Sequence, residues 1–481
     1  MKFEFLSVAA AALMFAACNE PLNDAAEVEK DSLCFAKGNE GFILGEKLEN
    51  PYSLSTMRLA YKQIKCLSKS ASANDDFIKA THLYIKFSPK TEEEYDLLTS
   101  DTTLDIYPYP LDYDIISYDG DYHDPELPDT IPTYQYASVP YSHKLPNIDY
   151  EILDSLFIPF EGKDTEEKSL SKSKEATIWD ELEYKALEIT NNLTEEDKKQ
   201  SISKKAKKWR PSGFVKVWDS SRYIGIEGAK IKARRLFTTH TGIADAEGRF
   251  SCNGTFKYAA TYLLEWERAD FKIKDGYIST AKLKGPTKKD CGWYLTVESD
   301  LQKFYATIFR AAYYYYYKQK KFVTPPSCNL RAYNYHASGD WGNFSAGRKK
   351  SPFTNAIHIY SRNQTLKQIF STTIHELTHA SHWEWSDIYK ETSSKIKESW
   401  CRGVEYELIT DVFGTCDNSY FNEYTPLFEK LRNKCGISIP SLQLIVWHSK
   451  TWDDLRNNIK THYKNANQND IDYYFNTYAT W

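Results

Sequence analysis

The sequence lacks several features that assign chains to common functional classes. None of the nine cysteines forms a CxxC pair, so a zinc site built from paired thiolates is not expected. The net charge of −5 shows no basic excess, which argues against a general nucleic-acid-binding role. Beyond the N-terminus, no apolar run is long enough to span a bilayer core of about 30 Å. At 481 residues the chain is too long for one ordinary core, and we expect two or three domains.

The N-terminus has the layout of an export signal. Lys2 is followed by a short run of small apolar residues that ends at Ala17 and Cys18. This arrangement resembles a bacterial lipobox, in which residues 1–17 are removed and the mature chain begins at a lipidated Cys18. The resemblance implies an exported protein that is lipid-anchored to the bacterial outer membrane, on its periplasmic or cell-surface face. A plain signal peptide with an incidental cysteine is the alternative.

Changes in composition along the chain predict a multidomain α+β protein. Residues 18–50 form a predicted tether, and residues 51–162 a mainly β module rich in Tyr and Pro, whose prolines exclude long helices. Residues 163–209 are charged and small polar, and predict a partly helical linker. Period-two alternation broken by Gly and Asp predicts a small antiparallel β-sandwich at 210–280. Helical periodicity then predicts a mostly helical domain at 290–481.

Two of these segments resemble known modules. The Tyr/Pro-rich module, with segments such as HLYIKFSPKTEEEYDLL and YEILDSLFIP, resembles an N-terminal module of Bacteroidetes lipoproteins that carries no known chemistry. The segment at 210–280 resembles the carboxypeptidase-regulatory-like domains of the transthyretin type, which are generally non-catalytic. The residues that carry this second resemblance are Gly213, Gly225, Gly228, Asp245, Gly248 and Phe250.

The stretch TIHELTHASHW at 373–383 contains an HExxH pattern. The apolar face around it, without Gly or Pro, predicts a helix. His375 and His379 then lie one turn apart on one face, so both imidazoles can bind one cation. Glu376 can take a proton from a water molecule that zinc activates and deliver it to the leaving amine. The pattern therefore predicts a Zn²⁺ site with two histidine ligands and a general base.

The third ligand has to come from another part of the chain. A metzincin needs Gly at 382 and His at 385, whereas this sequence has His382 and Trp385, so that class is excluded. We expect His382 to be a capping residue or a neighbour of the ligands. The segment Gly403–Thr415 instead carries Glu407 and Asp411, four residues apart and hence on one helical face.

The ExxxD pattern followed by VFGT resembles the second zinc motif of thermolysin-like peptidases, the gluzincins. The resemblance implies that Glu407 is the third zinc ligand and that Asp411 accepts a hydrogen bond from a ligand histidine, which fixes its tautomer. Glu405 is the rival ligand, although no carboxylate follows it by four residues. The gap from His379 is longer than in thermolysin, and we expect a loop at 387–397 to absorb it.

Further resemblance covers substrate binding and the transition state. The segment NAIHIYSR at 355–362 alternates like an edge strand beside the active-site helix, and resembles the thermolysin strand that pairs with peptide substrate. This implies that Asn355 and Ala356 contact substrate. Tyr389 and His448 are the candidates for donors to the transition state, although a place in a packed helix explains His448 equally well.

These features predict an exported, lipid-anchored, zinc-dependent peptidase that hydrolyses a peptide or protein substrate. The alternative is a surface lipoprotein that binds glycan or protein through its Tyr-rich module and keeps a structural or vestigial metal site. Glu376 discriminates between them, because peptidase chemistry needs a carboxylate at this position and a binding module does not.

Overall fold

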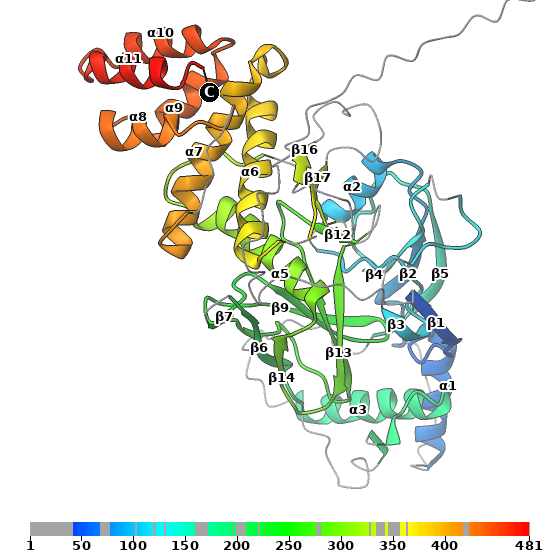
Figure 1. Ribbon diagram of the computed structural model, residues 1–481. Coiled ribbons are helices and arrows are strands. Elements are labelled where there is room, and N and C mark those ends of the chain that lie inside the picture. The colour runs from blue at the N-terminus through cyan, green and yellow to red at the C-terminus, as the bar shows by residue number, and fades with distance from the viewer. Residues whose placement is uncertain are drawn as a thin grey trace, which may run out of the picture.

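The protein has a mixed α+β fold, as the sequence predicts. The computed structural model describes residues 42–480 except 68–76, 102, 119–121, 129–130, 159–171, 196, 199–207, 220–221, 276–279, 327–328, 333–341, 345–355, 362–363 and 417–422. The predicted leader, Cys18 and the tether up to residue 41 lie outside the described residues. In Figure 1 the N-terminal region (blue) and the C-terminal helices (orange to red) lie on opposite sides of the central sheets (green). None of the described helices is both long and apolar enough to cross a membrane.

The N-terminal region contains small sheets and short helices. Its strands are β1 (Phe42–Lys47), β2 (His82–Phe87), β3 (Tyr113–Tyr118), β4 (Gln135–Pro140) and β5 (Tyr150–Leu156), and its first helices are α1 (Leu54–Leu67) and α2 (Glu92–Ser100). Strands β4, β2 and β5 form an antiparallel sheet in that order, and β1 pairs with β3. Tyrosine side chains fill much of the interior: Tyr52, Tyr84, Tyr107, Tyr109 and Tyr136 are buried. Much of the Tyr-rich composition of this region is therefore core packing.

Helix α3 (Lys172–Ile189) occupies part of the predicted linker. It packs against α1, and its Leu182 and Ala186 are buried in the same core as Phe237 of the central sheets. The C-terminal half of α3 therefore packs against the core through a buried apolar face.

The central region consists of two four-stranded sheets. Their strands are β6 (Ser212–Trp218), β7 (Tyr223–Gly225), β8 (Lys230–Arg235), β9 (Thr238–Ile243), β10 (Arg249–Ser251), β11 (Ala260–Glu265), β13 (Lys282–Lys288) and β14 (Trp293–Val297). One sheet has the order β10-β6-β14 with β7 also paired to β6, and the other has the order β13-β11-β8-β9. The strands continue to Val297, beyond the predicted boundary at 280. The sequence predicts an antiparallel sandwich. The β14–β6 pair is parallel, so this sheet is mixed and the prediction is wrong on this point.

A further sheet lies beside the C-terminal helices. It contains β12 (Ile273–Asp275), β15 (Asn329–Ala332), β16 (Gly342–Phe344) and β17 (Ala356–Ile359) in the order β12-β15-β17-β16. Strand β17 pairs with β15 on one side and β16 on the other, so the prediction of an edge strand at 355–362 is wrong. Among the described strands of this sheet, the edge nearest helix α6 (Leu366–Trp385) is β16.

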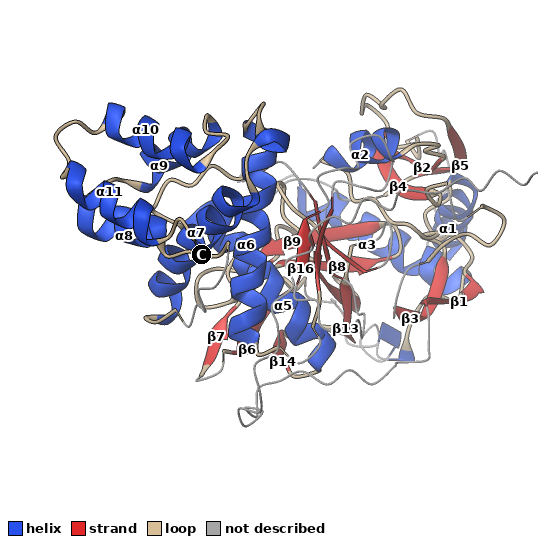
Figure 2. Cartoon of the chain, turned by 45° about the horizontal axis from the view of Figure 1, so that its top comes forward, coloured by secondary structure: helices blue, strands red, loops and turns tan. Residues whose placement is uncertain are grey.

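The C-terminal half is mostly helical. Besides α6 it contains α5 (Asp300–Tyr313), the π-helix η1 (Tyr314–Lys318), the 3₁₀ turn η3 (Tyr389–Glu391), α7 (Ser394–Phe413), α8 (Leu427–Cys435), α9 (Ile439–Trp447), α10 (Trp452–His462) and α11 (Gln468–Thr477). Helix α6 packs against both α5 and α7 and contacts β16 and β17 (Figure 2). One apolar core runs from the central sheets through these three helices into α11. Because α6 is held on several sides, the side chains it presents are firmly positioned.

Candidate metal centre

Helix α6 carries the HExxH pattern, as predicted. It begins with a capping box in which the Thr365 hydroxyl accepts from the Gln368 backbone and the Gln368 side chain accepts from the Thr365 backbone. The helix is buried along most of its length. His375 and His379 lie one turn apart with ring centroids 4.9 Å from each other, and both imidazoles are almost fully buried.

Helix α7 supplies the groups that face these histidines. It begins at Ser394, well before the predicted start near Gly403, and ends where Gly414 adopts a left-handed conformation with φ of 75°. The earlier start adds helical turns that carry Glu398 and Cys401, in a segment partly predicted to be a loop. Together with Glu405, these residues are spaced i, i+3 and i+7, which places them on one face of the helix.

One oxygen of Glu398 meets both histidines. Its Oε2 lies 3.2 Å from Nε2 of His375 and 3.1 Å from Nε2 of His379. Burial acts to raise the pKa of this carboxyl, but the two histidines outweigh burial and hold the pKa well below its usual range. The three side chains therefore form a site that favours a negative oxygen beside two imidazole nitrogens.

The tautomer of His375 favours a cation between this ring and Glu398. Its Nδ1 lies 3.1 Å from Oε2 of Glu405, so the Nδ1–H donates to that carboxylate. In the neutral imidazole, Nε2 then points its lone pair at Glu398. Two electron-rich atoms at hydrogen-bond distance repel each other unless a proton or a metal ion lies between them.

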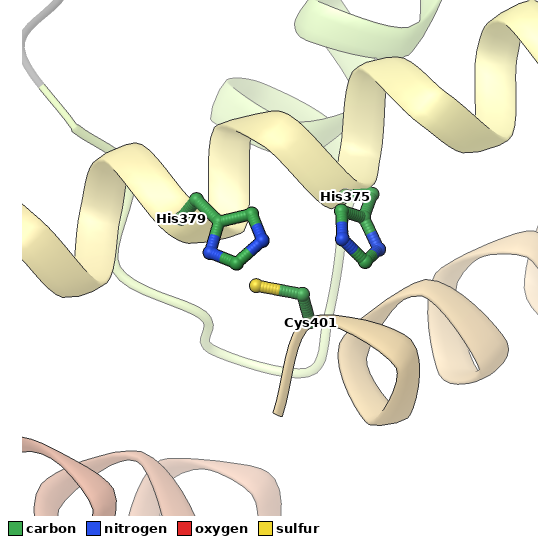
Figure 3. A group of neighbouring side chains, drawn as sticks. All are labelled: His375, His379 and Cys401. Atoms are coloured by element: carbon green, nitrogen blue, oxygen red, sulfur yellow. The ribbon is translucent and has the colours of Figure 1, made fainter. Parts of the chain in front are cut away.

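The distances fit a metal ion. Zinc bonds of about 2.0–2.1 Å to nitrogen and oxygen at tetrahedral angles place the ligand atoms about 3.3 Å apart. The separations of 3.1 and 3.2 Å between Glu398 and the histidines are close to this value, and are equally those of hydrogen bonds. Cys401 adds a thiol, because one ligand atom from each of His375, His379 and Cys401 lies within 4.8 Å of the others (Figure 3). This buried group could hold a metal ion.

Glu405 is fixed by its own partners. Its carboxylate accepts from Nη1 of Arg402 at 3.0 and 3.1 Å and from the hydroxyl of Ser371. Burial raises the pKa of Glu405, but Arg402 and His375 lower it below its usual value. A carboxylate held ionised in this way keeps the proton of His375 on Nδ1, so that Nε2 presents its lone pair toward Glu398.

The hydrogen bonding of Glu376 differs from that of Glu398 and Glu405. It is 1% exposed, and its Oε2 has no hydrogen-bond partner among the residues that the structure describes. Burial raises its pKa, with His379 and His375 acting in the opposite direction. A buried carboxylate oxygen without a partner, next to the histidine pair, could accept a hydrogen bond from a water molecule.

The structure does not bring the predicted third ligand to the histidines. Glu407 bonds to Lys321 at 3.3 Å and Arg432 at 2.8 Å, and Asp411 lies 3.4 Å from the same lysine. Glu405 faces His375, and each helical residue turns by about 100°, so Glu407 lies about 200° around α7 and points away. Neither Glu407 nor Asp411 therefore lies beside the histidines, and the carboxylates that meet them are those of Glu398 and Glu405.

The two predicted transition-state donors lie in different places. Tyr389 lies in η3 with its ring against His382, at a centroid distance of 4.9 Å, and burial raises the pKa of its phenol. His448 is exposed at the end of α9, where its Nδ1 donates to the carbonyl of Leu444 at 2.7 Å. The structure thus places Tyr389 against a residue of the HExxH helix and His448 at the surface.

The remaining predicted residues fall around the site or outside the described chain. His382 is fully buried with its ring against Tyr389, at a centroid distance of 4.9 Å, and burial lowers its pKa to about 3. It lies on α6 itself, one turn after His379, and its role as a neighbour of the ligands stays a prediction. Asn355 lies outside the described residues, and of Ala356 the structure describes only the backbone, which begins β17.

Comparison with known proteins adds no assignment. No family model matches the chain, and neither a curated protein nor a solved structure matches it. The function therefore has to be argued from the metal centre itself.

Proposed function

We propose that the chain is a zinc-dependent peptidase of the gluzincin type, in which His375, His379 and Glu398 hold the ion and Glu376 is the general base. The observation that carries this proposal is the single Glu398 oxygen at 3.2 and 3.1 Å from the two Nε2 atoms. The arrangement of two histidines on one helix and a glutamate on the next is the one that the gluzincin resemblance implies. In this proposal Glu398 takes the place that the resemblance implies for Glu407.

The residues present fit peptide-bond hydrolysis. Bound zinc supplies Lewis acidity, which polarises a carbonyl and makes a water molecule easier to deprotonate. Glu376 accepts the proton from the attacking water and passes it to the leaving amine. Burial raises the pKa of Glu376. A higher pKa suits both transfers, since a group that acts first as a base and then as an acid works best when its pKa is near the ambient pH.

Tyr389 is the side chain proposed to stabilise the developing negative charge. Its half-buried phenol packs against His382, one turn after His379 on α6, and its raised pKa keeps the proton on the oxygen. A neutral phenol donates a hydrogen bond to an oxyanion without a competing charge of its own. The substrate class remains peptide or protein, and export with lipid attachment at Cys18 is part of the same proposal.

The test is hydrolysis of a mixed peptide library by the full chain and its Glu376→Gln variant. We expect zinc-dependent cleavage by the wild type, and a loss of at least about 100-fold in the variant with unchanged zinc content. Absence of cleavage in the wild type with zinc bound at one ion per chain would contradict the proposal.

A second candidate function is ligand binding by the N-terminal half. A cavity of about 480 Å³ lies between this region and the central sheets, and Tyr52, Tyr107 and Tyr258 contribute to its wall. Ser138 also lines it, and its buried hydroxyl has no hydrogen-bond partner within the described parts of the chain. Aromatic walls with spare polar groups suit a glycan, so binding of oligosaccharides without any peptide cleavage would favour this candidate.

A further inference from the structure

Cys401 stands opposite the two histidines. It is on α7, three residues after Glu398, so both side chains project from the same face of that helix. Figure 3 shows the sulfur pointing from α7 toward the imidazoles on α6. Its sulfur lies within 4.8 Å of one nitrogen of each histidine. The thiol is therefore within reach of any ion that the histidines bind.

The surroundings of Cys401 allow little solvent contact. The side chain is fully buried. A coordinating metal ion deprotonates a thiol outright, so occupancy of the site by zinc would convert Cys401 into a thiolate.

The number of available ligands then becomes decisive. Catalytic zinc sites have three protein ligands and keep a fourth position for water or substrate, whereas sites with four protein ligands are closed. We propose that Cys401 is the fourth ligand, which joins His375, His379 and Glu398 in the resting protein and must leave before substrate is hydrolysed. This inference rests on the proposed function and adds its regulation.

Two consequences follow for the resting protein. Metal binding releases the thiol proton to solvent as the sulfur–metal bond forms. A soft thiolate also favours zinc or cobalt over magnesium, manganese or calcium, which narrows the choice of metal. Replacement of Cys401 by serine, which keeps the size but coordinates poorly, opens the fourth position.

The experiment uses full-length protein in which Co²⁺ replaces zinc, because cobalt bound by thiolate gives an intense near-ultraviolet charge-transfer band. We compare the wild type, Cys401→Ser, Glu398→Ala and the control Cys435→Ser, whose thiol lies at the end of α8. The band is expected in the wild type and Cys435→Ser and absent in Cys401→Ser. We also expect Cys401→Ser to bind zinc at least about tenfold more weakly than the wild type.

The outcomes separate this inference from the proposed function. Cobalt bound without a thiolate band, with affinity lost in Glu398→Ala, overturns the role of Cys401 and leaves the peptidase site intact. Cobalt bound equally by wild type and Glu398→Ala contradicts the metal site of the proposed function. If Cys401→Ser does not fold, Cys401→Ala and the wild-type spectrum decide the question, since the band in the wild type needs no variant.

Discussion

Replacement of Glu405 by glutamine tests whether the second helix orients His375. Glutamine keeps the size and one acceptor oxygen but loses the charge that holds Nδ1–H of His375 at 3.1 Å and Nη1 of Arg402 at 3.0 Å. Loss of a partner that orients a ligand histidine costs about 10- to 100-fold in metal affinity. This corresponds to about 1.4–2.8 kcal/mol.

The same substitution also acts on the metal-free fold. Arg402 and Glu405 are both nearly buried, and an interrupted buried ion pair costs about 3–5 kcal/mol. Because the amide oxygen can still accept one hydrogen bond, we expect a loss at the low end, about 3 kcal/mol of unfolding free energy.

Zinc competition with a chelator and urea unfolding of metal-free protein measure the two effects. The matched control is Glu407→Gln, which removes another buried carboxylate of α7 that pairs with Lys321 and Arg432. It should lower stability and leave zinc affinity unchanged. Equal zinc affinities in the wild type and Glu405→Gln would refute the orienting role.

Three further predictions follow from the same structure. Glu376→Gln should retain zinc and lose about 100- to 10,000-fold in kcat, measured with a fluorogenic peptide, and a smaller loss would argue against its role as general base. His382 has a pKa lowered from 6.5 to about 3 in the folded protein. Below 6.5, the ordinary pKa of histidine, the unfolded chain therefore binds more protons than the folded chain. The free energy of unfolding falls as the pH drops. Between about pH 7 and about pH 5 the wild type should lose about 2 kcal/mol more unfolding free energy than His382→Phe, and parallel pH profiles would exclude the effect. A Cβ added at Gly403 meets the Cβ of Phe428 at 2.5 Å, so Gly403→Ala should lower the urea midpoint. The cost of overpacking, about 1–3 kcal/mol, outweighs the gain of about 1 kcal/mol in helix propensity. An unchanged midpoint would show that α8 shifts to make room for the added methyl group.

The sequence predicted the histidine pair of the candidate metal centre because its signal is local. The i, i+4 spacing of His375 and His379, with apolar residues in phase and no helix breaker, is enough to place both rings on one face. The buried helix α6 confirms this prediction.

The groups that face this pair were missed because the start of α7 was not recognised. The segment before Trp400 is rich in Ser and Lys and was predicted to be a loop, yet Ile396 and Trp400 bury against the core and make it helical. If the helix is extended to residue 394, the spacing of Glu398, Cys401 and Glu405 at i, i+3 and i+7 predicts that they share one face.

Other differences depend on partners far away in the sequence. Glu407 is turned from the histidines and paired with Lys321, which follows η1, and with Arg432 on α8. Strand β17 is interior because β16 pairs with its free side. Long-range pairings of this kind leave no trace in the local pattern of either segment.

The most direct test of the account is the zinc content and affinity of the wild type, Glu398→Gln and Glu407→Gln. The account predicts one zinc per chain in the wild type and in Glu407→Gln, and binding weakened by at least about 100-fold in Glu398→Gln. Zinc retained at full affinity in Glu398→Gln and lost in Glu407→Gln would contradict the assignment of the third ligand.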